Sequence, residues 1–154
     1  MTESALLTAA ERGVLDAVCQ TFCPSLESEP GDDATLFALG ATDVRLSAAV
    51  QESLATLSER QRKELRRFLR LLDSRAFMML AARMPAGFAS LNAAQREAAL
   101  LALAGSHVPQ FRSGYQALKR LATFLFYAIV DESGRNPTWP ALSYRVPSPA
   151  PASS

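Results

Sequence analysis

The sequence predicts an all-α protein of about five helices folded as a single domain. Apolar residues recur at helical spacing along most of the chain, and capping residues stand just before several of these stretches. No stretch alternates polar and apolar residues as a strand would. With 154 residues, of which 49% are hydrophobic, the chain can bury a core of its own.

Two helices are expected in the first third of the chain. The first begins at the capping box Thr8-x-x-Glu11 and ends before Pro24. Residues 24–43 are broken by prolines, glycines and acids, so we interpret them as a loop with at most one short helical turn. A cap at Asp43 predicts the second helix. The residues expected to face the core are Val14, Leu15, Val18, Cys19, Phe22, Leu46, Val50, Leu54 and Leu57.

The middle of the chain predicts one long helix and one shorter helix. Ser58 would cap the long helix, which we expect to continue through Met84. After a loop, Asn92-x-x-Gln95 caps a fourth helix that reaches about Gly105. The expected apolar face of the long helix consists of Leu65, Phe68, Leu69, Leu72, Ala76, Met79 and Leu80.

The last predicted helix is apolar on more than one side. It begins at Pro109, a residue suited to a first helical turn, and is expected to end near Glu132. A helix that is apolar all round is either central to its own bundle or covered by another chain, and both readings stay open here. The core face would hold Phe111, Tyr115, Leu118, Ala122, Leu125 and Ile129, while Leu121, Phe124, Phe126, Tyr127 and Val130 extend the apolar surface around it.

The segment "DESGRNPTWPALSY" after this helix predicts an anchored, irregular turn. Asn136-Pro137 would fix the turn that presents Trp139, the only tryptophan, and Tyr144 follows shortly afterwards. The anchor could be the core of this chain or a second chain. We expect residues 1–144 to form the helical domain and residues 145–154, rich in Pro, Ser and Ala, to form a disordered or extended tail.

Few residues could carry catalysis or hold a metal ion. His107 is the only histidine and lies in a predicted turn, and Cys19 and Cys23 are expected to be small core residues on one helix face. These are too few ligands for a metal site of usual spacing, and no phosphate-binding glycine loop or Ser-His-Asp set is present. We therefore predict no catalytic, metal-binding or cofactor-binding residue in this chain.

A row of basic residues offers an alternative function. Arg60, Lys63, Arg66, Arg67 and Arg70 fall on one side of the long predicted helix, opposite its leucines. Such a basic face within residues 60–70 could bind nucleic acid or an acidic protein as a stand-alone module, although it is also typical of a solvated helix surface. The net charge of +1 gives nucleic-acid binding no support.

The expected location is the cytoplasm. The N-terminal residues show no basic region followed by an apolar stretch and a cleavage site, so no export signal is predicted. The longest apolar run, Leu121–Val130, is about half of what a membrane-spanning helix needs. A periplasmic location would require an exported partner to carry this chain.

Motifs from both ends of the chain resemble a known family. The opening stretch from Leu7 to Leu26 and the close of the chain resemble small subunits of the gluconate 2-dehydrogenase subunit 3 type. They are also similar to the helical N-terminal domain of long-chain fatty alcohol oxidases. The matching positions are Phe88, Leu91, Arg96, Glu97, Phe111, Arg112, Leu118, Lys119, Phe124 to Tyr127, Asp131 to Gly134, Asn136, Pro137, Trp139, Leu142 and Tyr144.

The resemblance implies a non-catalytic accessory subunit. Its partner would be a large FAD-dependent oxidoreductase of the glucose-methanol-choline (GMC) type, which binds the flavin and oxidises an alcohol or sugar. This chain would stabilise that partner or assist its folding. The expected interface or structural anchors are Phe124, Phe126, Tyr127, Asn136, Pro137, Trp139 and Tyr144.

Overall fold

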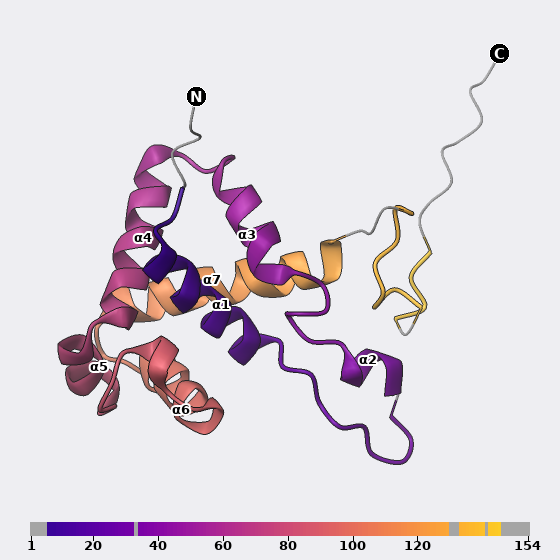
Figure 1. Ribbon diagram of the computed structural model, residues 1–154, viewed down its shortest axis with the longest axis horizontal. Helices are drawn as coiled ribbons and strands as arrows, with labels where there is room; N and C mark the ends of the chain where they lie inside the picture. Colours follow the sequence, from indigo (N-terminus) through magenta and orange to yellow (C-terminus); the bar gives the residue numbers. More distant parts are fainter. Residues whose placement is uncertain (1–5, 33, 130–132, 141, 146–154) are drawn as a thin grey trace.

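The computed structural model describes residues 6–32, 34–129, 133–140 and 142–145, and all regular structure in these ranges is helical (Figure 1). The predicted fold class is therefore confirmed. The helices are α1 (Ala9–Phe22), α2 (Ala34–Ala38), α3 (Leu46–Leu54), α4 (Glu59–Asp73), α5 (Arg75–Ala82), α6 (Ala93–Ala104) and α7 (Pro109–Ala128), with a 3-10 turn at Phe88–Ser90.

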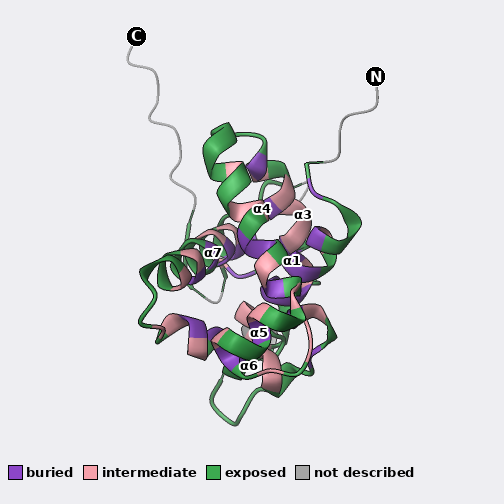
Figure 2. Ribbon diagram, turned by 90° about the vertical axis from the view of Figure 1, so that its left-hand side faces the viewer, coloured by how far each residue is buried: buried purple, intermediate pink, exposed green. Residues whose placement is uncertain are grey.

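Helix α7 is the longest of these helices and runs through the middle of the bundle (Figure 1). Helix α1 packs against it and also contacts α3, α4 and α6. Helices α3 and α4 lie on one side of α7 and helices α5 and α6 on the other. Buried residues line the inward sides of these helices, as Figure 2 shows. The most buried include Val14, Leu15, Val18, Leu46, Val50, Leu54, Leu69, Leu72, Met78, Phe88 and Leu103.

The predicted N-terminal caps are confirmed where the signal is local. Thr8 and Glu11 form a reciprocal capping box on α1, in which each backbone N–H donates to the side chain of the other. The same arrangement joins Ser58 to Gln61 on α4 and Asn92 to Gln95 on α6. Pro109 occupies the first turn of α7 as expected. Each cap satisfies backbone donors that the helix itself leaves unpaired.

The prediction of one helix from Ser58 to Met84 was wrong, because the chain breaks at Ser74. This residue has an extended backbone (φ −75°, ψ 118°), and its hydroxyl accepts a hydrogen bond from Phe77 N–H, which starts α5 in a new direction. The break allows Gly87 to pack directly on the Asp73 carbonyl, where any Cβ would clash. Of the apolar face predicted beyond the break, Ala76, Met79 and Leu80 are exposed, while Met78 and Ala82 are buried instead.

Two predicted boundaries also moved. Asp43 does not cap α3, since its carboxylate accepts a hydrogen bond from Gly40 N–H (2.8 Å) and closes a turn before the helix. Helix α3 begins at Leu46, after Arg45 in the left-handed region (φ 51°). Helix α7 ends at Ala128, earlier than predicted, and residues 130–132 lie outside the described part of the chain. The helical turn expected in the 24–43 loop corresponds to α2.

Candidate functional site

The side chain of Asn136 closes the C-terminal end of α7. Asn136 is 1% exposed, and its amide nitrogen donates to the carbonyl oxygens of Phe126 (2.9 Å) and Ile129 (2.6 Å). The amide oxygen accepts hydrogen bonds from the backbone N–H and the hydroxyl of Thr138. The last carbonyls of a helix have no partner within that helix, so Asn136 supplies two of the missing donors from the turn that follows.

Trp139 completes the same end of the helix. Its indole N–H donates to the carbonyl oxygen of Tyr127 (3.0 Å), and its ring lies 4.9 Å from the ring of Tyr144 between centroids. The backbone of Tyr144 in turn donates to the carbonyl of Trp139 (3.0 Å). The described residues of this turn, 136–140 and 142–144, are therefore anchored on the helix of their own chain, and Pro137 is exposed.

The seven predicted anchors divide into an inward and an outward group. Phe126 and Asn136 are buried, and Trp139 is half-buried by its contacts with α7. Phe124 is 68% exposed, Tyr127 is 42% exposed and Tyr144 is 51% exposed, although each is a large apolar or aromatic side chain. The fold places these three side chains near the end of α7 and leaves much of the surface of each side chain exposed to solvent.

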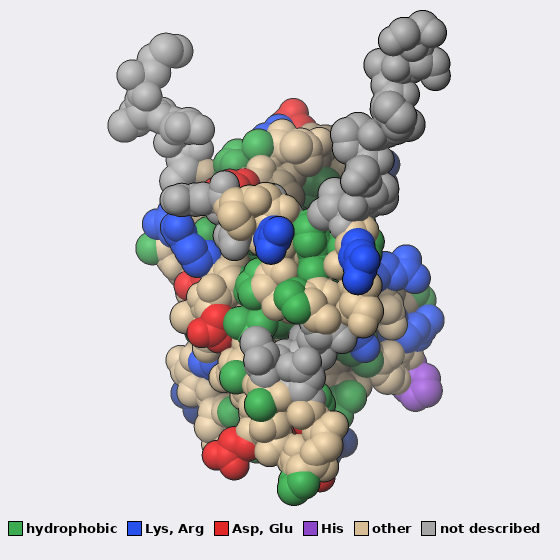
Figure 3. Space-filling view, turned by 90° about the vertical axis from the view of Figure 1, so that its right-hand side faces the viewer, with side chains coloured by type: hydrophobic (Ala, Val, Ile, Leu, Met, Phe, Trp, Pro, Cys, Tyr) green, Lys and Arg blue, Asp and Glu red, His purple; other side chains and the backbone are tan. Residues whose placement is uncertain are grey.

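These outward side chains give the molecule an apolar face. Figure 3 views the side on which α7 ends and shows hydrophobic side chains over the middle of that face, with Lys and Arg side chains mainly in its upper half and Asp and Glu side chains at the left and lower edges. Leu142, 50% exposed, adds to this region from the turn. We call Phe124, Tyr127, Leu142 and Tyr144 the aromatic end of α7. Large apolar side chains left exposed on a helix and in the turn that follows it are typical of a surface that another macromolecule covers.

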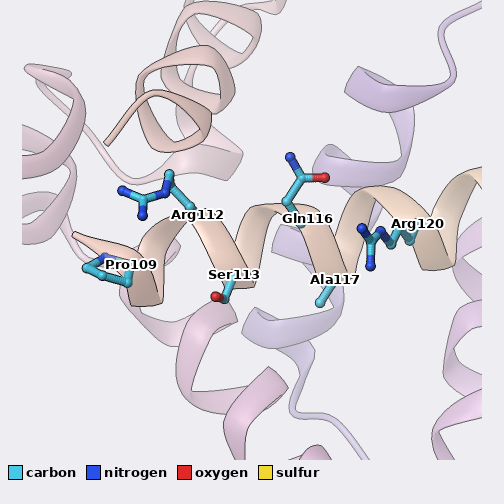
Figure 4. Close-up of a pocket in the computed structure, with 6 residues that line it drawn as sticks. All are labelled: Pro109, Arg112, Ser113, Gln116, Ala117 and Arg120. Carbon is cyan, nitrogen blue, oxygen red and sulfur yellow. The ribbon is translucent and has the colours of Figure 1, made fainter. Parts of the chain in front are cut away.

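A shallow hollow continues along the outer side of α7 toward its N-terminus. All of its lining side chains project from this one helix, as Figure 4 shows, so it is an open groove along a helix and no enclosed ligand pocket. The sequence indicated Pro109 as a helix start and Arg112 as a position of the family motif, but its patterns did not predict that these residues line a groove. The lining residues are Pro109, Arg112, Ser113, Gln116, Ala117 and Arg120.

The basic face predicted on residues 60–70 is largely engaged within the chain. Arg66 and Arg70 both pair with Glu11 of α1, at 3.1 and 2.8 Å, and the Glu11 side chain is only 2% exposed. Arg60 pairs with Glu64 and Lys63 with Glu59, each one turn away on α4. Four of the five predicted cations thus face a carboxylate of the same molecule.

The pairing explains how a carboxylate remains charged in the core. Burial favours the neutral acid and would raise the pKa of Glu11. The hydrogen bonds from Thr8 N–H, Arg70 and Arg66 act in the opposite direction and lower the pKa from 4.5 to about 2. Sequence analysis identified Glu11 as part of a cap but missed this role, since its partners are more than fifty residues away.

The remaining titratable candidates show no arrangement for catalysis. Burial raises the pKa of the Cys19 thiol to about 12 and that of Cys23 to about 11, so neither thiol is an activated nucleophile. His107 is exposed in the turn before α7. Among the described residues no group of three His, Cys, Asp or Glu side chains could hold a metal ion. Within those same ranges, no helix is long and apolar enough to cross a membrane.

The fold and this surface define a small helical domain with an exposed aromatic end. Residues 9–134 match the model of the gluconate 2-dehydrogenase subunit 3 family, and the chain belongs to that family. A stretch of 62 residues is 36% identical to part of the long-chain-alcohol oxidase FAO4A of Arabidopsis thaliana. The matched stretch covers 40% of this chain and 8% of the oxidase. No solved structure matches the chain. The resemblance seen in the sequence motifs is therefore confirmed.

Proposed function

We propose that this protein is a non-catalytic accessory subunit of an FAD-dependent dehydrogenase or oxidase of the GMC type. The catalytic chain would bind the flavin and oxidise an alcohol or sugar hydroxyl. The present chain would stabilise it or assist its folding by covering apolar surface with the aromatic end of α7.

One structural observation carries the proposal. Asn136 and Trp139 already donate hydrogen bonds to the carbonyl groups at the end of α7. An uncapped helix end is therefore not the reason why Phe124, Tyr127 and Tyr144 are exposed. They remain exposed beside a turn that is hydrogen-bonded within the chain. Aromatic side chains held in fixed positions are typical energetic centres of protein interfaces.

The family relationship supports the same class of function. The family is named for a subunit of a dehydrogenase, which supports a role for this chain as one subunit of a larger oxidoreductase. The matched oxidase acts on long-chain alcohols by its name, and this chain corresponds to a small part of it. We infer that the flavin and the catalytic groups belong to a separate partner chain, and we leave the substrate class at alcohols or sugars.

The alternative of a nucleic-acid-binding module is less favoured by the geometry. Binding to a duplex rests on several cations that are free to contact phosphates. Here Arg66 and Arg70 are held by a buried carboxylate, and Arg60 and Lys63 are paired along the helix. Strong retention on heparin that falls steeply with salt would support this alternative.

Co-expression tests the proposed function directly. A tagged copy of this chain is expressed together with the FAD-dependent dehydrogenase chain encoded nearest to it in the same genome, and the purified material is examined for flavin absorbance. We expect a stable flavoprotein complex and a higher yield of soluble catalytic chain than without this subunit. Purification of the tagged chain without any flavoprotein would contradict the proposal.

A further inference from the structure

The outer side of α7 carries only positive charge. Between Pro109 and Ala128 the helix contains Arg112, Lys119 and Arg120 and no Asp or Glu. Exposed residues spaced alternately four and three apart form a line along this helix, and helices pack on one another through such a spacing. Arg120 belongs to this line, and Arg112 and Lys119 lie beside it. The line consists of residues at alternating intervals of four and three, namely Ser113, Ala117, Arg120, Phe124 and Tyr127.

Arg120 on this line and Arg112 beside it have no ion-pair partner among the described residues. Arg112 donates to the carbonyl oxygen of Ser106 (2.6 Å), and Lys119 lies over the ring of Tyr115, 5.8 Å from its centroid. Neither contact removes the positive charge.

The line changes character along its length. At the N-terminal half, short side chains at Ser113 and Ala117 lie between Arg112 and Arg120 and form the groove seen in Figure 4. At the C-terminal half, Phe124 and Tyr127 are exposed on the same line. A partner that matches the whole line must offer negative charge at one end and apolar surface at the other.

We infer that the outer side of α7 is the docking surface for an acidic amphipathic helix of the catalytic chain. Carboxylates of that helix face Arg112 and Arg120, and its apolar residues cover Phe124 and Tyr127. This inference rests on the proposed function and specifies the chemistry of the contact. It adds a direction to the complex, because the two arginines precede the two exposed aromatic residues along α7.

The charge pattern argues against two other occupants. A second copy packed symmetrically on this face would present its own α7, which contains no carboxylate to pair with Arg112 or Arg120. A nucleic acid would find too few cations on α7, since tight binding neutralises roughly six to ten phosphates. An acidic protein helix satisfies both halves of the line.

Charge reversal on α7 tests the inference. The variant Arg112→Glu/Arg120→Glu is compared with Arg67→Glu/Arg75→Glu, in which two exposed arginines of α4 and α5 undergo the same change in net charge. The probe is the purified flavoprotein chain of the co-expression experiment, and affinity is measured at several NaCl concentrations. Arg112 lies in the first turn of α7, where a glutamate favours the helix, so the variant should remain folded.

We expect the α7 double variant to bind roughly ten- to a hundredfold more weakly than the unaltered chain. The α4/α5 double variant should bind nearly as well as the unaltered chain, and the affinity of the unaltered chain should fall as salt rises. If both double variants bind equally, or if binding is insensitive to salt, the inference is overturned while the proposed function stands. If no flavoprotein binds the unaltered chain at all, both fail together.

Discussion

The indole nitrogen of Trp139 donates to the carbonyl oxygen of Tyr127, a residue whose own side chain is exposed near that of Phe124. The backbone of Tyr127 is thus capped by the indole of Trp139, while the side chain of Tyr127 is exposed to solvent. Asn136 performs the equivalent task for the carbonyls of Phe126 and Ile129. The C-terminal turn belongs to the fold of this chain, and it fixes the position of the surface proposed to meet the partner.

Replacing Asn136 should destabilise the domain without altering its exposed surface. We expect Asn136→Asp to cost about 2 kcal/mol of the free energy of unfolding, because it removes the donors and places a negative charge against the carbonyls at the end of α7. Urea denaturation monitored by circular dichroism measures the effect. Asn92→Ala, which removes an exposed N-terminal cap, serves as a control at about 1 kcal/mol. A fully stable Asn136→Asp variant would contradict the capping role.

Stability should fall in acid because of Glu11. Its pKa is lowered in the folded state, from 4.5 to about 2, so the stabilisation is fully present above about pH 4.5 and is lost as the pH falls toward 2. The whole effect is about 2–3 kcal/mol, with Arg66 and Arg70 partly screened by solvent.

The variant Glu11→Gln checks this assignment. It should be less stable at neutral pH and show a weaker dependence of stability on pH below 4.5. The control is Glu59→Gln, because Glu59 pairs with Lys63 on the exposed surface and should leave the pH profile nearly unchanged. A Glu11→Gln protein with an unaltered acid profile would assign the transition to other groups.

The aromatic end of α7 can be truncated with little effect on folding. We expect Phe124→Ala/Tyr127→Ala to change the free energy of unfolding by no more than about 1 kcal/mol, since both side chains are exposed. The same variant should lose binding to the flavoprotein chain, measured by co-purification. Phe126→Ala is the matched control on the buried side and should cost about 3 kcal/mol or more. Full retention of the flavoprotein by the double variant would remove the main support for the proposed function.

Two glycines should respond to alanine in opposite directions. Gly13 lies exposed within α1 with open space where a methyl group would stand, so Gly13→Ala should raise stability by about 0.5–1 kcal/mol. Gly87→Ala should lower the melting temperature clearly, because its Cβ would collide with the backbone carbonyl of Asp73. Thermal unfolding of both variants measures the contrast. Equal tolerance at both sites would show that the α4–α5 bend is not built on this close approach.

Three of the four side-chain caps predicted from sequence are confirmed, and the fourth, Asp43, closes a turn with Gly40 instead. Thr8, Ser58 and Asn92 cap their helices as expected, because a cap depends on residues within one turn of it. The break at Ser74 was not predicted, because the apolar pattern continues at helical spacing on both sides of this residue. The close packing of Gly87 on Asp73 that accompanies the bend joins two parts of the chain that are not adjacent in sequence. Periodicity alone cannot distinguish one long helix from two short ones.

The site shows the same division between local and distant causes. The sequence indicated that Asn136 and Trp139 were anchored, but their acceptors lie seven to twelve residues back along the chain. The basic row on α4 suggested a binding face, whereas Glu11, distant in sequence, occupies Arg66 and Arg70. Arg112 belongs to the family motif and Arg120 does not, and no sequence pattern indicates the docking role proposed for them, which depends on the neighbours that folding brings to them.

The hydrogen-bonded turn after α7 has a consequence for the thermodynamics of association. A segment that must become ordered on binding loses conformational entropy at that moment and weakens the complex. Residues 136–140 already make their backbone and side-chain contacts in the isolated chain, so the backbone at the end of α7, which carries Tyr127, is held in place before any partner arrives. The subunit can then meet its partner as a nearly rigid body, with most of the heat-capacity change arising from the surfaces that come together.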